Sequence, residues 1–84
     1  MITLLYFARL RETFGLSSEQ ANLPADVADV RSLTEWLRQR GGAWHEELAQ
    51  GKPVRVAVNQ DIATPDTSVR DGDEVALFPP VTGG

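Results

Sequence analysis

Few side chains in this sequence could do acid–base or nucleophilic chemistry. The only histidine is His45, which stands beside Glu46 and Glu47, so any Ser–His–Asp arrangement would depend on it. A lone histidine in a polar stretch is more often a solvated surface residue than a general base. One histidine and two glutamates also lack the HExxH spacing and the ligand number of a zinc site. We therefore expect no catalytic site and no metal site inside this chain.

The remaining candidate motifs have simple structural explanations. The run Asp71-Gly72-Asp73 beside Glu74 groups three carboxylates, but it is typical of a turn in which glycine supplies a positive φ. Neither GxGxxG nor GxxxxGK[ST] occurs, so no phosphate-binding loop is expected. The absence of cysteine excludes disulfides, thiolate metal ligands and cysteine nucleophiles. We expect Trp36 and Trp44 to pack inside the protein rather than to stack on a ligand.

The end of the sequence suits chemistry better than its interior. Pro79-Pro80 fixes φ twice and favours a semi-rigid stalk, followed by Val81-Thr82-Gly83-Gly84. The six residues after Phe78 span about 20 Å when extended, which is enough to enter a partner protein. Glycine lacks a Cβ, so a narrow channel can close around the last two residues. If a partner adenylated the Gly84 carboxylate, attack by sulfur would yield a thiocarboxylate. The alternative is an ordinary frayed terminus.

Local patterns predict the elements that must position this end. An apolar run at 2–8 predicts a central strand covered on both faces. Other strands are expected at 20–23, 54–58, around Ile62 and at 74–78, with turns at 51–53, 59–61 and 71–73. A turn or a short helix is expected at 9–15, and one short helix is expected at 43–49.

The strongest helix signal covers 30–40. Asp29 is a suitable N-cap, and Val30, Leu33 and Leu37 form one apolar stripe. Arg38 and Arg40 favour the last turn, and Gly41-Gly42 stops the helix. We expect the stripe to pack on Val54, Val56 and Val58.

This order of elements predicts an α+β fold of the β-grasp type. One main helix cannot cover both faces of a sheet, so a mixed sheet of about five strands should curl around it. The first and last strands should lie side by side in the middle. Residues 1–80 then form the β-grasp domain, and residues 81–84 form a flexible carrier tail that leaves from the centre of the sheet.

Size and composition agree with a small globular domain. The chain has 84 residues, 42% of them hydrophobic, and a formal net charge of −4. A basic face is needed for nucleic acid or for an anionic membrane, so neither partner is expected. The apolar opening is interrupted by Arg9 and Arg11, which makes it too short for a membrane span. A fold without cysteine suits the cytoplasm.

Three segments together carry a family resemblance. They are the ending 71–84, the opening Phe7-Ala8 followed by Arg11-Glu12, and Val58-Asn59. In this order and spacing they resemble the small subunit of molybdopterin synthase, also called the MoaD family, over essentially the whole chain. The resemblance implies a ubiquitin-like β-grasp fold.

The resemblance also implies a cycle of partners. An adenylyltransferase of the ubiquitin-activating type uses ATP and Mg²⁺, and a persulfide enzyme donates sulfur; this chain itself binds no cofactor. The large synthase subunit holds the catalytic side chains and passes the sulfur to cyclic pyranopterin monophosphate. Two copies of each subunit form a heterotetramer. One exposed sheet face is expected to meet both the large subunit and the adenylyltransferase, so the two complexes should exclude each other.

Residue roles follow from the same resemblance. Gly84 carries the sulfur, and Gly83 gives the tail its clearance. Contacts with the partner are expected from Phe7, Arg11, Phe78, Pro79, Pro80, Val81 and Thr82. Core packing is the alternative for both phenylalanines. Leu77 departs from relatives, which often have an aromatic residue there.

Other functions share this fold and the Gly-Gly ending. They are a thiamine-type sulfur carrier, a ubiquitin-like modifier, and a β-grasp interaction module whose tail is never activated.

Overall fold

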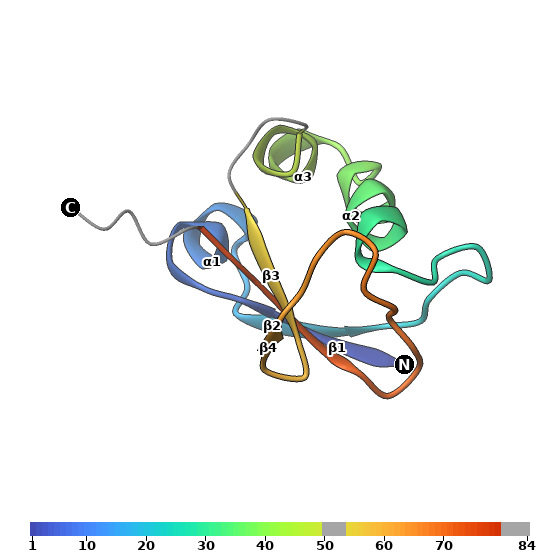
Figure 1. Ribbon diagram of the computed structural model, residues 1–84. Helices are drawn as coiled ribbons and strands as arrows, with labels where there is room; N and C mark the ends of the chain where they lie inside the picture. The colour runs from blue at the N-terminus through green and yellow to red at the C-terminus, as the bar shows by residue number, and fades with distance from the viewer. Residues whose placement is uncertain (50–53, 80–84) are drawn as a thin grey trace.

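The structure, a computed structural model, describes residues 1–49 and 54–79. Within these residues the strands pair into one mixed sheet (Figure 1). In chain order the elements are β1 (Ile2–Tyr6), α1 (Ala8–Phe14), β2 (Ser18–Ala21), α2 (Val30–Arg38), α3 (Gly42–Glu47), β3 (Arg55–Val58), β4 (Asp61–Ile62) and β5 (Glu74–Phe78). The sheet order is β2-β1-β5-β3-β4. The central strands β1 and β5 are parallel, and the other neighbours are antiparallel. The predicted β-grasp sheet, with first and last strands adjacent, is confirmed.

The first strand is central but buried on one face only. Ile2, Leu4 and Tyr6 are fully buried, whereas Thr3 and Leu5 are half-buried. The helices α2 and α3 lie on one side of the sheet (Figure 1). The prediction that this strand is covered on both faces is therefore wrong. Its continuous apolar run arises because the outward position of Leu5 is apolar as well.

The main helix begins where its capping residue predicts. The Asp29 carboxylate accepts a hydrogen bond from the backbone N–H of Ser32 at 2.8 Å, and the Ser32 hydroxyl accepts one from the Asp29 N–H at 3.2 Å. This reciprocal arrangement satisfies free amides at the start of the helix. The stripe of Val30, Leu33 and Leu37 is buried, as predicted.

The helix ends two residues earlier than predicted, at Arg38. The amides that follow form hydrogen bonds to carbonyls three residues back, instead of the four of an α-helix. The Arg40 N–H donates to the Leu37 carbonyl and the Gly41 N–H to the Arg38 carbonyl, both at 3.1 Å. Gly41 then has φ 80°, a left-handed conformation that stops the helix. Arg40 thus lies beyond the last helical turn, and its side chain contacts residues outside this helix.

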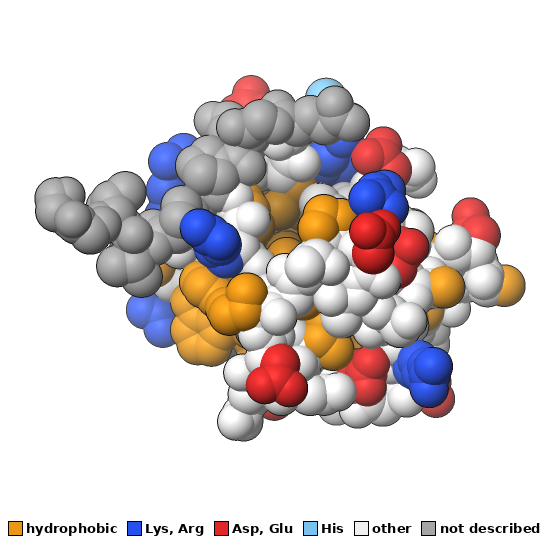
Figure 2. All heavy atoms as spheres, in the orientation of Figure 1, with side chains coloured by type: hydrophobic (Ala, Val, Ile, Leu, Met, Phe, Trp, Pro, Cys, Tyr) orange, Lys and Arg blue, Asp and Glu red, His pale blue; other side chains and the backbone are white. Residues whose placement is uncertain are grey.

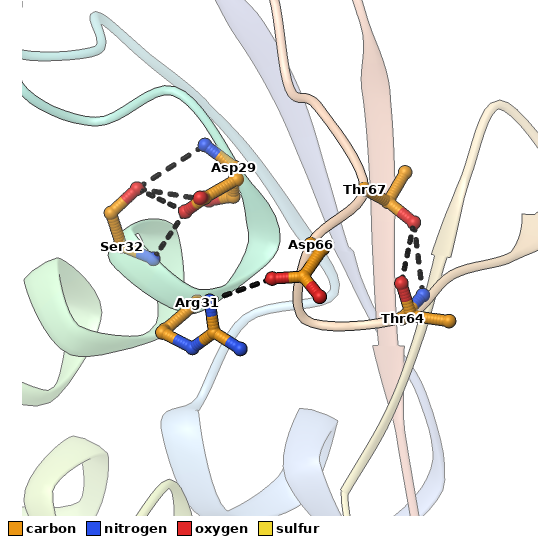
Figure 3. Close-up of polar contacts among 6 residues, drawn as sticks. All are labelled: Asp29, Arg31, Ser32, Thr64, Asp66 and Thr67. Atoms are coloured by element: carbon orange, nitrogen blue, oxygen red, sulfur yellow. Dashed lines mark hydrogen bonds and ion pairs between the residues drawn. The ribbon is translucent and has the colours of Figure 1, made fainter.

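A loop from the other half of the chain closes the N-terminus of α2 (Figure 3). The Val30 N–H donates to the Thr67 carbonyl at 3.0 Å, and the Arg31 N–H donates to the Pro65 carbonyl at 2.9 Å. The Arg31 guanidinium also pairs with Asp66 at 2.8 Å. Because the first helical amides are already satisfied, this helix end is not a free anion-binding site.

Other predicted boundaries shift as well. The first strand ends at Tyr6 rather than at residue 8, and α1 begins at Ala8 rather than at residue 9. The second strand lies at 18–21 rather than 20–23, because Ile2 pairs with Ala21 and Leu5 with Ser18. Leu23 falls beyond the paired residues, although it is half-buried against the core. The short helix expected within 43–49 runs from Gly42 to Glu47. The predicted turn at 51–53 lies outside the described residues.

The predicted packing of α2 on β3 holds in part. Val58 is buried in the core, whereas Val54 and Val56 are only half-buried at its edge. A hollow of about 430 Å³ separates them from the helix, and Val30 and Leu48 line it too. Figure 2 shows hydrophobic atoms at the bottom of this recess between α2 and β3.

Aromatic side chains join α1 and α3 to the first strand. The rings of Phe14 and Trp44 are stacked with centroids 3.8 Å apart, and Tyr6 meets both edge-on at 5.3 Å. The Arg40 guanidinium lies 4.4 Å from the Trp44 ring centroid. Trp36 also packs against the core. Both tryptophans are therefore packing residues, as predicted.

Candidate functional site: the open face of the sheet

Strand alternation brings two predicted site residues together on the uncovered face of the sheet. Leu77 lies opposite Tyr6 in the parallel pair, so the next residues, Phe7 and Phe78, are neighbours. The Phe7 N–H donates to the Leu77 carbonyl at 3.2 Å, which extends the ladder to this point. Arg55 lies opposite Phe78 on the other side. A row of Phe7, Phe78 and Arg55 therefore crosses the face at the end of β5.

Neither phenylalanine belongs to the core cluster. The side chain of Phe7 is 45% exposed, and that of Phe78 is half-buried. By contrast, their neighbours Tyr6 and Leu77 are each 1% exposed on the opposite face. The core-packing alternative thus does not describe Phe7 or Phe78.

A second, apolar row lies next to the first. The strand register places Leu5, Ala76, Ala57 and Ile62 side by side across four strands. Ile62 is 68% exposed, which is unusual for so large an apolar side chain. In Figure 2, hydrophobic side chains gather at the lower left, between α1 and β4.

Sequence reasoning missed this apolar row and Arg55. Within β1 and β5 the outward residues could have been found, because Leu5 and Ala76 are apolar at positions where a solvated face would carry polar side chains. The contribution of β3 and β4 could not be found in this way, since it depends on which strands are neighbours.

The other end of the open face is polar. Thr3 lies opposite Gln20 on one side and opposite Glu74 on the other. The Asn59 side chain accepts from the Glu74 N–H at 3.0 Å and donates to Asp73 at 3.1 Å. Bonds from the Arg70 amide and from Asn59 lower the pKa of Asp73. The face therefore changes from charged to apolar toward the end of β5.

Arg11 lies on α1, which follows directly after Phe7. It is exposed, and no ion pair joins it to another side chain among the described residues. Its neighbour Arg9 pairs with Glu47 of α3 at 2.9 Å. Arg11 is thus available to a partner at this end of the molecule.

The predicted tail lies mainly outside the described residues. Pro79 is half-buried directly after β5. Pro80, Val81, Thr82, Gly83 and Gly84 are outside the described residues, so their expected roles stay predictions. What the structure shows is that the strand leading to them is central in the sheet.

The described residues offer little that resembles a catalytic centre. His45 is exposed, and no group of three His, Asp or Glu side chains within 1–49 and 54–79 could hold a metal ion. No helix in the same part of the chain is long and apolar enough to cross a membrane. The exposed apolar side chains of Phe7 and Ile62 suit the open face to docking on another protein.

Comparisons with known proteins agree with this fold. The model of the ThiS family matches residues 4–84. The chain is 42% identical to the molybdopterin synthase sulfur carrier subunit of Haemophilus influenzae over 100% of both chains.

Two solved structures have the same fold. SAMP1 from Haloferax volcanii is 28% identical with a TM-score of 0.79, covering 99% of this chain and 98% of that one. The complex of subunits 1 and 2 of the molybdopterin-converting factor from Helicobacter pylori contains a chain that is 26% identical with a TM-score of 0.60, covering 99% and 97%. This chain therefore belongs to the ThiS family and, within it, to the ubiquitin-like molybdopterin synthase sulfur carrier subunits, or MoaD family.

Proposed function

We propose that this protein carries sulfur on the carboxyl group of Gly84 during molybdopterin synthesis. The observation that supports this most directly is the position of β5. It is a central strand whose end, at Phe78, lies beside an exposed apolar surface. A partner that docks on this surface is well placed to receive the residues that follow. The relative from Haemophilus influenzae, which matches along the full length of both chains, is named for this role.

The proposed chemistry occurs on the chain terminus and uses the side chains of partners. An adenylyltransferase with ATP and Mg²⁺ joins AMP to the Gly84 carboxylate and releases pyrophosphate. The outer sulfur of a persulfide on the donor enzyme then displaces AMP at the carbonyl carbon and forms an acyl disulfide with that enzyme. A thiol cleaves the S–S bond, which releases the thiocarboxylate and leaves a disulfide on the donor enzyme. Gly83 allows the tail to pass through a narrow channel because it has no Cβ.

The charged carrier then docks on the large synthase subunit. A complex of the two subunits is known for the Helicobacter pylori protein, which is similar in fold. We propose that Phe7 and Phe78 bury their rings in this interface, with Arg11 and Arg55 at its rim and residues 79–82 leading inward. The large subunit supplies the catalytic side chains, and the sulfur passes to cyclic pyranopterin monophosphate. Two such transfers build the dithiolene, in a heterotetramer.

The first experiment is a measurement of intact mass. The purified protein is incubated with its adenylyltransferase, ATP, Mg²⁺ and sulfide, and the expected product has gained the difference between one sulfur and one oxygen. A variant that lacks Gly84 is the matched control and should keep its original mass. An unchanged mass for the full chain, with an enzyme shown to be active, would contradict the carrier function.

The likeness to SAMP1, a small archaeal modifier protein, favours a second candidate function. In that case the activated Gly84 would be joined to lysine side chains of other proteins. Incubation of the thiocarboxylate form with the large synthase subunit and cyclic pyranopterin monophosphate distinguishes the two. Loss of sulfur and return of a free carboxylate support the carrier function. Retention of sulfur, together with ladders of higher mass in a lysate containing the adenylyltransferase and ATP, supports the modifier.

A further inference from the structure

Ala8 has a backbone conformation that alanine disfavours. Its φ is 53°, in the left-handed region that suits glycine. Within the described residues the other non-glycine positions of this kind are Asn59 and Gln60. Those two form the tight turn between β3 and β4, where a positive φ at both positions matches the twist of the hairpin. Ala8 is not in a hairpin, so its conformation needs another explanation.

The turn at Ala8 separates two residues that point to opposite sides of the sheet. Phe7 before it is still extended, with φ −125° and ψ 156°, and its ring lies on the open face. Leu10, three residues later, is 1% exposed in the core. The chain therefore changes from strand to helix within one residue. A left-handed residue allows so abrupt a change.

Phe7 is held by its backbone on both sides of this turn. Its N–H donates to the Leu77 carbonyl at 3.2 Å, and its own carbonyl accepts from Leu10 and Arg11 at 3.1 and 3.4 Å. These bonds link β5, Phe7 and α1. The orientation of the Phe7 ring thus depends on the rigidity of the residue that connects the strand to the helix.

A glycine at this position would make the same turn without strain. The methyl group of Ala8 is exposed, so it does not fill the core. Alanine disfavours this left-handed region, but once the surrounding hydrogen bonds hold the residue there, its methyl group leaves a narrower range of φ and ψ than glycine would have. Strained residues of this kind occur where a fixed geometry serves a function.

We propose that Ala8 is a positioning residue that holds Phe7 in the orientation needed for docking. This inference rests on the proposed function, because it takes the large synthase subunit as the partner. A stiff connection binds more tightly than a flexible one, since less conformational freedom is lost on association. Ala8 therefore lowers the stability of the fold but increases the affinity for the partner.

The test compares two glycine variants. Ala8→Gly removes the restriction beside Phe7, and Gln60→Gly is the matched control, because Gln60 has φ 73° in the hairpin turn at the polar end of the face. Both variants should melt at or above the temperature of the parent protein. Isothermal titration against the large synthase subunit should show binding weakened about two- to tenfold for Ala8→Gly and unchanged for Gln60→Gly. Equal affinity of Ala8→Gly and the parent would overturn the proposal.

Replacement of Ala8 by D-alanine, in a chemically synthesised chain, separates stiffness from contact. D-Alanine prefers a positive φ but still restricts the backbone, so it should bind about as tightly as the parent. If it binds as weakly as Ala8→Gly, the methyl group itself contacts the partner and the positioning role is wrong. Amide ¹⁵N relaxation of the free protein gives a second measure: the order parameter of Phe7 should fall in Ala8→Gly alone. If the parent protein itself does not bind the large subunit, the proposed function fails, whereas the relaxation result still reports on the stiffness of the connection.

Discussion

At the level of single residues, the Glu19 side chain connects β2 to β1 and to the segment between α2 and α3. It accepts a hydrogen bond from the Tyr6 hydroxyl at 2.7 Å and two from the Arg40 guanidinium at 2.8 and 3.0 Å. The bonds from Arg40 are the main reason that the pKa of Glu19 lies below its ordinary value of 4.5. Burial and the bond to Glu19 raise the pKa of Tyr6, so its hydroxyl stays protonated as a donor. The ionised form of Glu19 therefore stabilises the folded protein.

This arrangement predicts how stability depends on pH. A carboxyl whose pKa is lower in the folded state stabilises the protein above its unfolded pKa, and the effect is lost as the pH falls through the folded pKa. Glu19→Gln should lower the free energy of unfolding by about 1–2 kcal/mol at pH 7, a range reduced because Glu19 is partly exposed. Thermal melts from pH 7 to pH 3 should show this difference shrinking below pH 4.5, the ordinary value for Glu19.

The control for this experiment is Glu46→Gln, because Glu46 is exposed on α3. It should melt like the parent protein throughout the pH range. A constant difference between Glu19→Gln and the parent down to pH 3 would show that the charge of Glu19 is not the stabilising feature.

At the level of elements, α2 has its N-terminus closed by the loop 63–69 and its apolar stripe set into the core. Its first amides donate to carbonyls of that loop. Its buried stripe faces the sheet, although a hollow separates part of the helix from Val54 and Val56. The fully buried positions of α2 should therefore contribute most of the stability that this packing provides.

Leu33 tests that packing, because it is 1% exposed in the middle of the helix. Leu33→Ala should lower the free energy of unfolding by about 2–5 kcal/mol, since it removes buried methyl groups and leaves a cavity. Denaturant titration measures the change. Arg31→Ala on the same helix is the control: it breaks only the exposed pair with Asp66 and should cost less than about 1 kcal/mol. If the free energy of unfolding falls by the same small amount in both variants, the packing of Leu33 does not stabilise the core.

At the level of the whole molecule, the two sides of the sheet differ: one is covered by helices and the other is open. One side holds α2 and α3, and the core lies between helices and strands (Figure 1). The open side presents the apolar row from Leu5 to Ile62 and, beside it, the row that contains Phe7 and Phe78. We propose that partners that bind the residues after β5 dock at this end of the open face.

A shared docking face predicts that the large synthase subunit and the adenylyltransferase compete. Adding an excess of the large subunit should slow adenylation of the carrier, measured as pyrophosphate release. The inhibition should be relieved by more carrier, because the large subunit acts by sequestering it. A stable complex of all three proteins in size-exclusion chromatography would contradict this prediction.

Local signals were sufficient for most elements of this fold. The strand at 74–78 and the start of the helix at Val30 agree with the sequence predictions, because strand alternation, capping and glycine stops act over a few residues. The order of elements then predicted the β-grasp sheet, since few packings can cover one helix with these strands. The Gly-Gly ending left both carrier chemistry and a frayed terminus open, and the resemblance carried by three segments together then favoured the carrier.

The docking surface was decided by the tertiary structure. Phe7 and Phe78 become neighbours only because β1 and β5 pair in parallel with one register, and a slip of one residue would turn either ring toward the core. The apolar row through Ala57 and Ile62 likewise depends on pairing between β5, β3 and β4. Sequence alone determined which elements form, and it supplied the prediction that the terminus carries sulfur. Which side chains share a face was set by hydrogen bonds between strands far apart in the chain, and no local pattern contains that information.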